Sequence, residues 1–310
     1  MSDAIGAGSG TGAGTGTGAG GAVGARIVDR GYQHYTGKRL APSHAWGVMV
    51  RAALRRAMGI RRSGRAKIAP WGLTVVAYAP TLILLGLRFL LPISGRLPLP
   101  GYNVLLSNTV ILFVLFAGLA APDLLCADRR ERVLSLLFAS PITRLSYVGA
   151  QVAALTILLL LLTLLPMLLL FAGNALLADA AGAYVRDHLG DLWHITLSGG
   201  LLALYYSAVA MAVASFTDRR AYATGAFLGL MLVSGVVASV LTRVMRTAGH
   251  EWFALLDLVY LPLRLVYALF GGSNLLYPRL GNDAVTLAAT LGVIVVSLAL
   301  TSWRYQRVRD

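Results

Sequence analysis

Six long apolar segments constrain the fold of this chain more than any other feature of its sequence. Each holds about 20 residues with few charges, and a helix of that length crosses the ~30 Å hydrocarbon layer of a bilayer. We therefore expect an all-α polytopic membrane protein with a six-span transmembrane domain over residues 69–303. The predicted spans are approximately Ala69–Leu91, Val104–Pro122, Tyr147–Gly173, Ile195–Phe216, Tyr222–Thr242 and Ala284–Trp303.

The composition argues against a single soluble domain. Of the 310 residues, 57% are hydrophobic and only 13% are charged, whereas soluble domains carry about 25% charged residues. A soluble core could not cover so much apolar surface, so lipid is the solvent that suits this chain. Because Cys126 is the only cysteine, the sequence provides neither an internal disulfide nor a cysteine-based zinc cluster.

The positions of the Lys and Arg residues predict the orientation in the membrane. Twenty of the 27 basic residues fall in segments that six spans would place on one side, together with both termini. Cytoplasmic loops carry an excess of Lys and Arg. We therefore expect a multi-pass protein of the bacterial plasma (inner) membrane, with its amino terminus and its tail, residues 304–310, in the cytoplasm.

A seventh apolar segment, Trp252–Phe270, is a poor candidate for a span. It contains Asp257, Pro262 and Arg264, and each ionised residue at mid-bilayer costs about 2.5–3.5 kcal/mol. We therefore place it on the outer side, within an outer segment of about residues 245–281. Two forms remain open: a re-entrant hairpin with a break near Pro262, and a helix that lies flat in the interface.

The region before the first span divides into two parts. Residues 1–25 are a repeat of Gly, Ala, Ser and Thr, which predicts a disordered tail. Within the basic segment 26–68, the stretch Ser43–Lys67 carries an apolar stripe at helical spacing, with arginines on the opposite face. Such a helix beside a span favours the membrane surface and its lipids over nucleic acid, so no nucleic-acid partner is expected. The stripe is Trp46, Met49, Val50, Ala53, Leu54, Ala57 and Met58.

A mixed segment, Asp123–Arg144, lies between the second and third predicted spans and packs seven charges into 22 residues. Asp128 and Arg132 are four apart with the acid first, which favours a short helix, and Pro141 ends it. Five large apolar residues between them and the proline indicate docking into another protein. A solvated loop whose arginines only set the orientation is the alternative. The apolar residues are Val133, Leu134, Leu136, Leu137 and Phe138.

This segment resembles the connection between spans two and three of type-two ATP-binding-cassette (ABC) permeases. In that family a charged cluster precedes a Leu-Leu pair, then Ser-Pro-Ile/Leu and a basic residue. With the amphipathic helix, the spans and the outer segment, the resemblance covers about Ser43 to Arg309. One departure is Arg132-Val133, where the family commonly has Gly-Thr. The matching positions are Asp128, Arg129, Arg130, Glu131, Arg132, Leu136, Leu137, Ser140, Pro141, Ile142 and Arg144.

The resemblance implies a transport subunit with a cytoplasmic coupling helix at about residues 123–144, which follows the closure of an ATPase dimer. Since the chain lacks a Walker A sequence, we expect no enzyme activity and no bound cofactor. ATP and Mg belong to a separate ABC ATPase subunit, and a second permease chain, identical or a paralogue, completes the complex. The candidate coupling residues are Asp128, Arg129, Arg130, Glu131, Arg132, Leu136, Leu137 and Pro141.

Polar residues inside the predicted spans are candidates for the substrate path or for helix packing. Because the spans are otherwise apolar, they suit export of an amphipathic or hydrophobic compound such as a drug, a natural product or a lipid. Gly225 and Gly229 form a small-xxx-small pair that permits close contact with a helix of this chain or of another. The substrate-path candidates are Ser107, Asn108, Tyr205 and Tyr206.

Two other classes of function remain open from the sequence. Asp187, Asp191 and His194 would share one helical face and could hold a divalent metal in a polytopic membrane enzyme. The competing interpretation is the polar end of a loop, and we expect no metal site. A passive channel or scaffold is the second alternative, and it would need no ATPase.

Overall fold

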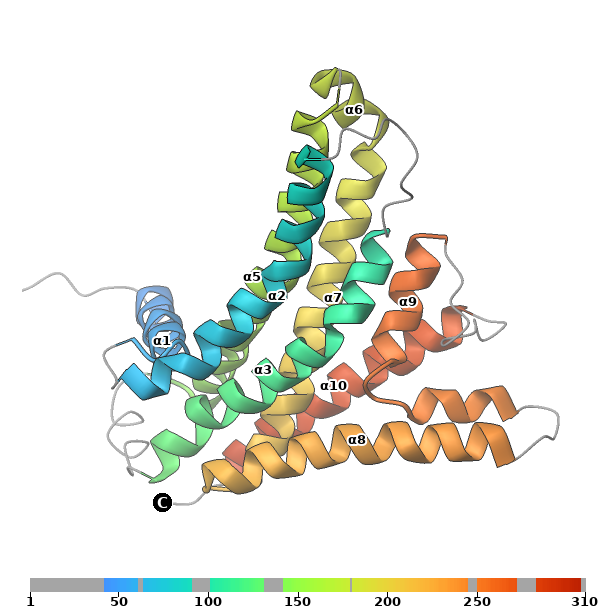
Figure 1. The fold of residues 1–310 in the computed structure, drawn as a ribbon. Coiled ribbons are helices and arrows are strands. Elements are labelled where there is room, and N and C mark those ends of the chain that lie inside the picture. The colour runs from blue at the N-terminus through green and yellow to red at the C-terminus, as the bar shows by residue number, and fades with distance from the viewer. Residues whose placement is uncertain are drawn as a thin grey trace, which may run out of the picture. The chain divides into compact units, whose positions relative to one another are not determined.

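The computed structural model of the chain describes residues 42–60, 64–90, 101–130, 142–178, 180–244, 250–271 and 283–307. Every regular element in these residues is a helix, which confirms the predicted all-α fold (Figure 1). In chain order the elements are α1 (Pro42–Ala57), α2 (Gly64–Leu90), α3 (Tyr102–Arg130), α5 (Arg144–Leu176), α6 (Ala181–Asp187), α7 (Leu189–Ala214), α8 (Arg220–Val244), the 3-10 helix η1 (His250–Leu256), α9 (Leu261–Leu269) and α10 (Asp283–Arg307).

Six of the described helices are long and apolar enough to cross a membrane, as the sequence predicts. They are α2, α3, α5, α7, α8 and α10, and each contains one of the expected apolar segments. The largest difference from the expected boundaries is in α3, which continues without a break past Pro122 to Arg130. A helix of 29 residues is about 43 Å long, so its polar end extends beyond the hydrocarbon layer.

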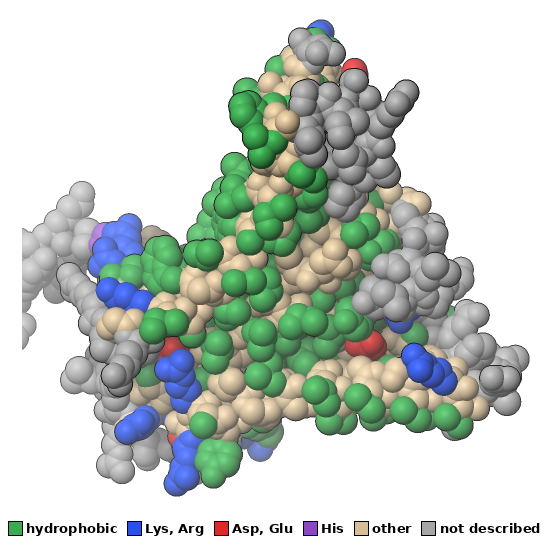
Figure 2. Space-filling view, in the orientation of Figure 1, with side chains coloured by type: hydrophobic (Ala, Val, Ile, Leu, Met, Phe, Trp, Pro, Cys, Tyr) green, Lys and Arg blue, Asp and Glu red, His purple; other side chains and the backbone are tan. Residues whose placement is uncertain are grey.

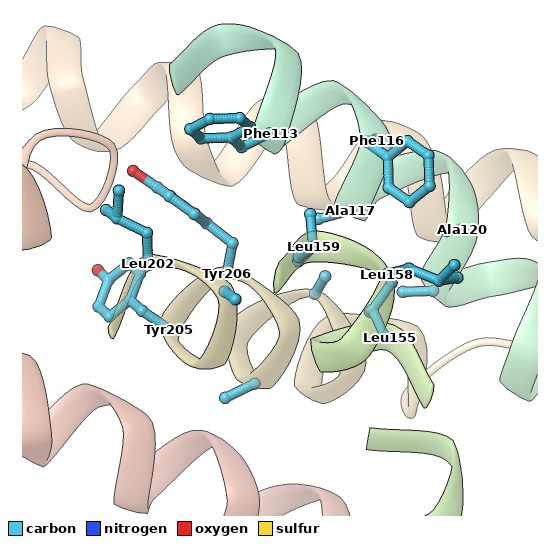
Figure 3. Close-up of a cluster of buried hydrophobic side chains, with 14 of the residues drawn as sticks. Phe113, Phe116, Ala117, Ala120, Leu155, Leu158, Leu159, Leu202, Tyr205 and Tyr206 are labelled. Atoms are coloured by element: carbon cyan, nitrogen blue, oxygen red, sulfur yellow. The ribbon is translucent and has the colours of Figure 1, made fainter. Parts of the chain in front are cut away.

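The core of the bundle is formed by α3, α5 and α7. Figure 3 shows side chains of these three helices meeting in one buried cluster. Leucine and alanine on the facing surfaces carry no polar side-chain atoms, so these residues pack together without needing hydrogen bonds between their side chains. The labelled members are Phe113, Phe116, Ala117 and Ala120 of α3, Leu155, Leu158 and Leu159 of α5, and Leu202, Tyr205 and Tyr206 of α7, all of them buried.

The flanking helices α2, α8 and α10 bury one face and leave the other exposed. In Figure 2 hydrophobic side chains extend along the free edge of α8. A large contiguous apolar surface marks contact with a membrane or a partner. These faces therefore suit lipid or a second chain. Exposed apolar side chains on them include Val75, Val76 and Ile83 of α2, Val233, Val236 and Val237 of α8, and Val295 and Val296 of α10.

The amphipathic segment before the first span forms α1. Its apolar stripe packs against α5 and α3 through the buried residues Val50, Ala53 and Ala57. Arg51 and Arg55 on the opposite face are exposed, as the helical spacing predicts. Its placement on the membrane surface stays a prediction.

The outer segment folds as a broken hairpin rather than as one continuous helix. Its first arm, η1, packs against α8, and its second arm, α9, packs against α7, α10 and α3 (Figure 1). The reversal is made by Asp257, whose Oδ1 accepts hydrogen bonds from the backbone N–H groups of Val259 and Tyr260 at 3.1 and 3.2 Å. Pro262 lies in the first turn of α9, where its missing N–H costs nothing.

Candidate functional site

Arginine side chains gather at one end of the bundle, where α3 and α10 end and α8 begins. We call this the basic end, and Figure 2 shows Lys and Arg side chains grouped there, at the lower left of the view. It contains the described part of the predicted coupling segment. Its arginines are Arg56, Arg129, Arg130, Arg144, Arg219, Arg220, Arg304 and Arg307.

Asp128 is a buried junction between three helices at the basic end. Its carboxylate forms an ion pair with Arg56 of α1. On its other oxygen, Oδ2, it accepts hydrogen bonds from the Tyr147 hydroxyl at 2.6 Å and from Nε2 of Gln151 at 3.4 Å, both in α5. A buried carboxylate needs such partners, because an unpaired charge away from water is strongly unfavourable. Asp128 therefore joins α3 to α1 and to α5.

Arg129, the next residue, joins α3 to the opposite side of the bundle. Its Nη1 donates to the backbone carbonyl of Ser215 at 2.6 Å and lies 3.4 Å from the Asp218 carboxylate, both in the connection between α7 and α8. Its guanidinium also lies over the ring of Tyr305 in α10, 4.5 Å from the centroid. The side chain is only 7% exposed. Arg130 in contrast is exposed, so the two neighbouring arginines have different environments.

An open pocket of about 980 Å³ lies beside these contacts. One wall is the end of α3 and the other is the start of α8, where Arg220 forms an ion pair with Asp123 at 2.9 Å. Four arginines and two aspartates line it, so the pocket carries a net positive charge and suits acidic groups. The lining residues are Pro122, Asp123, Cys126, Ala127, Arg129, Arg130, Asp218, Arg219, Arg220 and Ala221.

The structure describes only part of the predicted coupling segment. Residues 123–130 extend α3, and α5 begins at Arg144, with the Thr143 side chain accepting from the Ser146 N–H at its amino end. Arg144 donates to the backbone carbonyl of Gln306 at 2.9 Å, which joins α5 to α10 at the basic end. The segment between is therefore held at both ends by the helix bundle. The candidates Glu131, Arg132, Leu136, Leu137 and Pro141 lie outside the described residues.

Comparison with known families decides the identity. Residues 107–309, about two thirds of the chain, match the model of the ABC-2 family transporter protein. The chain belongs to the ABC-2 transporter family. A search of the curated proteins finds no match. The match confirms the resemblance drawn from the segment between spans two and three, and the protein is a membrane-spanning permease subunit of an ABC transporter.

In this ABC-2 permease, two of the four predicted substrate-path residues, Ser107 and Tyr206, form hydrogen bonds with the outer segment. The Ser107 hydroxyl lies 3.0 Å from the Tyr267 hydroxyl of α9. Tyr206 donates to the backbone carbonyl of Val259 at 2.6 Å, and Tyr205 is fully buried beside it. These contacts hold the hairpin against α3 and α7. Asn108 is exposed on α3, so it is not grouped with the others.

The predicted packing pair on α8, Gly225 and Gly229, faces open space. Both glycines are exposed, and a Cβ atom added to either would meet no described side chain within 4 Å. The close contact between α3 and α8 is made elsewhere: Thr224 donates to the Gly118 carbonyl at 2.9 Å, and a Cβ atom at Gly118 would lie 2.8 Å from Phe227. Gly118 has no small residue four positions away, so it is not part of a small-xxx-small pair in the sequence.

The outer segment buries two charged residues. Asp257 at the reversal is half-buried against α8, where the Ser234 hydroxyl accepts from the Leu258 N–H at 3.3 Å. Burial raises the pKa of the Asp257 carboxyl above its ordinary value, against the opposing effect of the Val259 and Tyr260 N–H groups and of Arg264. Arg264 on α9 is itself buried. These residues are positioned by the hairpin and hold it in shape.

The alternative metal site receives no support from the described part of the chain. Asp187 lies in α6, whereas Asp191 and His194 lie in α7, and no group of three His, Cys, Asp or Glu side chains there could hold a metal ion. The His194 ring instead packs edge-on against Phe270, with centroids 5.6 Å apart. The three residues thus lie in two separate helices.

Proposed function

We propose that this permease exports an amphipathic or hydrophobic compound, such as a drug, a natural product or a lipid, using ATP hydrolysed by a separate ABC ATPase subunit. The basic end faces the cytoplasm, in line with the excess of Lys and Arg on cytoplasmic segments. The observation that carries the proposal is the family match together with the junction at Asp128 and Arg129, where the chain leading to the coupling segment is tied to the rest of the bundle.

The junction supports a rigid-body transmission of force. Asp128 ties the end of α3 to α1 and α5, and Arg129 ties it to the α7–α8 connection and α10. A displacement of residues 131–141 by the ATPase would therefore move the ends of several spans together. Coupled movement of packed helices between two arrangements is the way such transitions reach distant sites.

The working unit in this proposal contains two permease chains and two ATPase chains. The exposed apolar faces of α2, α8 and α10 provide surface for the second permease chain. The positive pocket at the basic end provides surface for acidic groups of the ATPase. Three of the candidate coupling residues, Asp128, Arg129 and Arg130, form the end of α3, and Glu131 follows them in the sequence.

The test is a pair of charge reversals in the complete complex. The permease is expressed with its ATPase, reconstituted in lipid vesicles, and assayed with a panel of fluorescent amphipathic compounds. Glu131→Lys is expected to reduce both ATPase co-purification and compound-stimulated ATP hydrolysis. Asp283→Lys, the same reversal on the exposed first turn of α10, is the matched control and should change neither.

Two results would contradict the proposal at different levels. Equal coupling in both variants would remove Glu131 from the ATPase contact while leaving the transport function intact. Movement of the compounds without ATP, or no movement with it, would instead favour a passive channel or scaffold.

A further inference from the structure

A second pocket, of about 450 Å³, is an open groove on the side of the bundle between α7, α8 and α10. On each helix its lining residues recur every three or four positions, so each helix presents one face to the groove. Leu258, at the reversal of the outer hairpin, lies at the end away from the basic end. The helical lining consists of Val209, Ala212 and Val213 of α7, Tyr222, Ala226 and Leu230 of α8, and Val293, Ser297 and Leu300 of α10, with Phe216 and Thr217 beyond α7.

The dimensions of the groove match one leaflet of a bilayer. From Tyr222 to Leu230 the helix rises about 12 Å, whereas half of the hydrocarbon layer is about 15 Å thick. The lining is almost entirely apolar, since only Ser297, Thr217 and the Tyr222 hydroxyl contribute polar atoms. A groove of this length and composition suits a hydrocarbon chain.

The groove is positively charged at one end. Arg219 precedes Tyr222 by three residues, and its guanidinium lies 5.7 Å from the centroid of the Tyr222 ring. On α10, Arg304 follows Leu300 by four residues and therefore shares its face of the helix. Both arginines are exposed. The nearest acid in sequence, Asp218, lies 3.4 Å from Arg129. The α8 wall and the α10 wall of the groove therefore each have an arginine at the basic end.

We propose that this groove binds an anionic phospholipid from the leaflet at the basic end. One acyl chain lies along α7 between α8 and α10, and the phosphate lies between Arg219 and Arg304. Exposed arginine favours this contact, because guanidinium binds phosphate in a charge-assisted geometry. The proposal goes beyond the export function, since the lipid is a bound component of the permease whether or not it is transported.

The headgroup is tested by lipid retention on the purified full-length chain. Native mass spectrometry is run with equal amounts of phosphatidylglycerol and phosphatidylcholine in the detergent. The wild-type chain is expected to retain phosphatidylglycerol preferentially. Arg219→Gln and Arg304→Gln should each lower that retention roughly fivefold. Arg243→Gln, at the opposite end of α8, is the matched control and should leave retention unchanged.

The acyl-chain site is tested by filling the groove. Ala226 is an exposed lining residue, so Ala226→Phe adds bulk without displacing the core and should lower retention of both lipids. Equal retention of the two lipids by the wild-type chain, or an unchanged preference in Arg219→Gln and Arg304→Gln, would overturn the proposal. Efficient cross-linking of two chains through Ala226→Cys, with Cys126 replaced by Ala, would show that a second copy occupies the groove instead. None of these readouts requires ATP hydrolysis, so failure here is separable from failure of the transport function.

Discussion

One buried carboxylate, Asp128, organises the basic end at the scale of single residues. Its partners Arg56, Tyr147 and Gln151 come from two other helices. The first of them is 72 positions away in the sequence, and the others are 19 and 23 positions away. Sequence spacing could single out Asp128 as part of a charged segment, but it could not reveal these donors, because only the fold brings them together.

Replacing Asp128 is predicted to loosen this junction. Asp128→Ala leaves the buried Tyr147 hydroxyl and Gln151 amide without their acceptor, which costs about 1–3 kcal/mol in the free energy of unfolding. The melting temperature of the purified chain in detergent should fall, and the buried Cys126 thiol of the same helix should react faster with a maleimide. Asp218→Ala is the control: its side chain is 70% exposed, and exposed ion pairs contribute little. Equal effects of the two substitutions would contradict the role given to Asp128.

At the scale of helices, the sequence predicts those elements that a long run of apolar residues identifies. All six spans were predicted from runs of about 20 apolar residues, and each predicted span overlaps one of the six long helices. The end of α3 was not predicted, because its charged residues indicate a separate polar segment in the sequence. In the structure Asp128 has partners on α1 and α5, and Arg129 contacts the α7–α8 connection and Tyr305 of α10, so both charged residues are accommodated within a continuing helix.

The outer hairpin is the element whose stability should depend on pH. Burial raises the pKa of Asp257 above the ordinary 3.8, so the folded hairpin binds a proton more tightly than the unfolded one. Asp257 therefore contributes stability that is complete below its ordinary pKa and is lost as the pH rises through the raised pKa. Hydrogen–deuterium exchange around residues 254–262, corrected for intrinsic rates, should therefore show falling protection over that window.

Asp257→Asn separates charge from hydrogen bonding in this element. The amide retains an oxygen that accepts from Val259 and Tyr260 but carries no titrating proton. Protection of the hairpin in this variant should be independent of pH, and at neutral pH at least as strong as in the wild-type chain. A pH-dependent loss that persists in Asp257→Asn would assign the effect to another group.

The charge distribution predicts the orientation of the whole molecule in the membrane. If the basic end faces the cytoplasm, a membrane-impermeant maleimide added to intact cells should label Gly182→Cys and should not label Arg130→Cys. Both positions are exposed and lie in α6 and at the end of α3. The background is Cys126→Ala, and permeabilised cells serve as the labelling control. The reverse pattern would invert the topology and remove the coupling role from the basic end.

For the molecule as a whole, the sequence predicts the class of protein and the number of spans. It does not predict how the candidate substrate-path residues are arranged. Ser107 and Tyr206 were selected as polar residues in apolar spans, and the fold places them against the hairpin. Their partners Tyr267 and Val259 belong to a segment that is itself irregular. These contacts depend on where α9 packs against α3 and α7, and no local pattern in the sequence predicts that position.

Because α3 is one continuous helix about 43 Å long, it can act as a lever between the two ends of the bundle. One arm ends in Arg129 and Arg130, and the other begins at Tyr102, whose ring lies 6.1 Å from that of Phe270 at the end of α9. If an ATPase displaces the end at Arg130, a rigid α3 that pivots on the packed core would move the Tyr102 end in the opposite direction. Pro122, inside the helix, is where such a lever bends most easily. Movement driven at the basic end and movement beside Phe270 would then depend on the same helix.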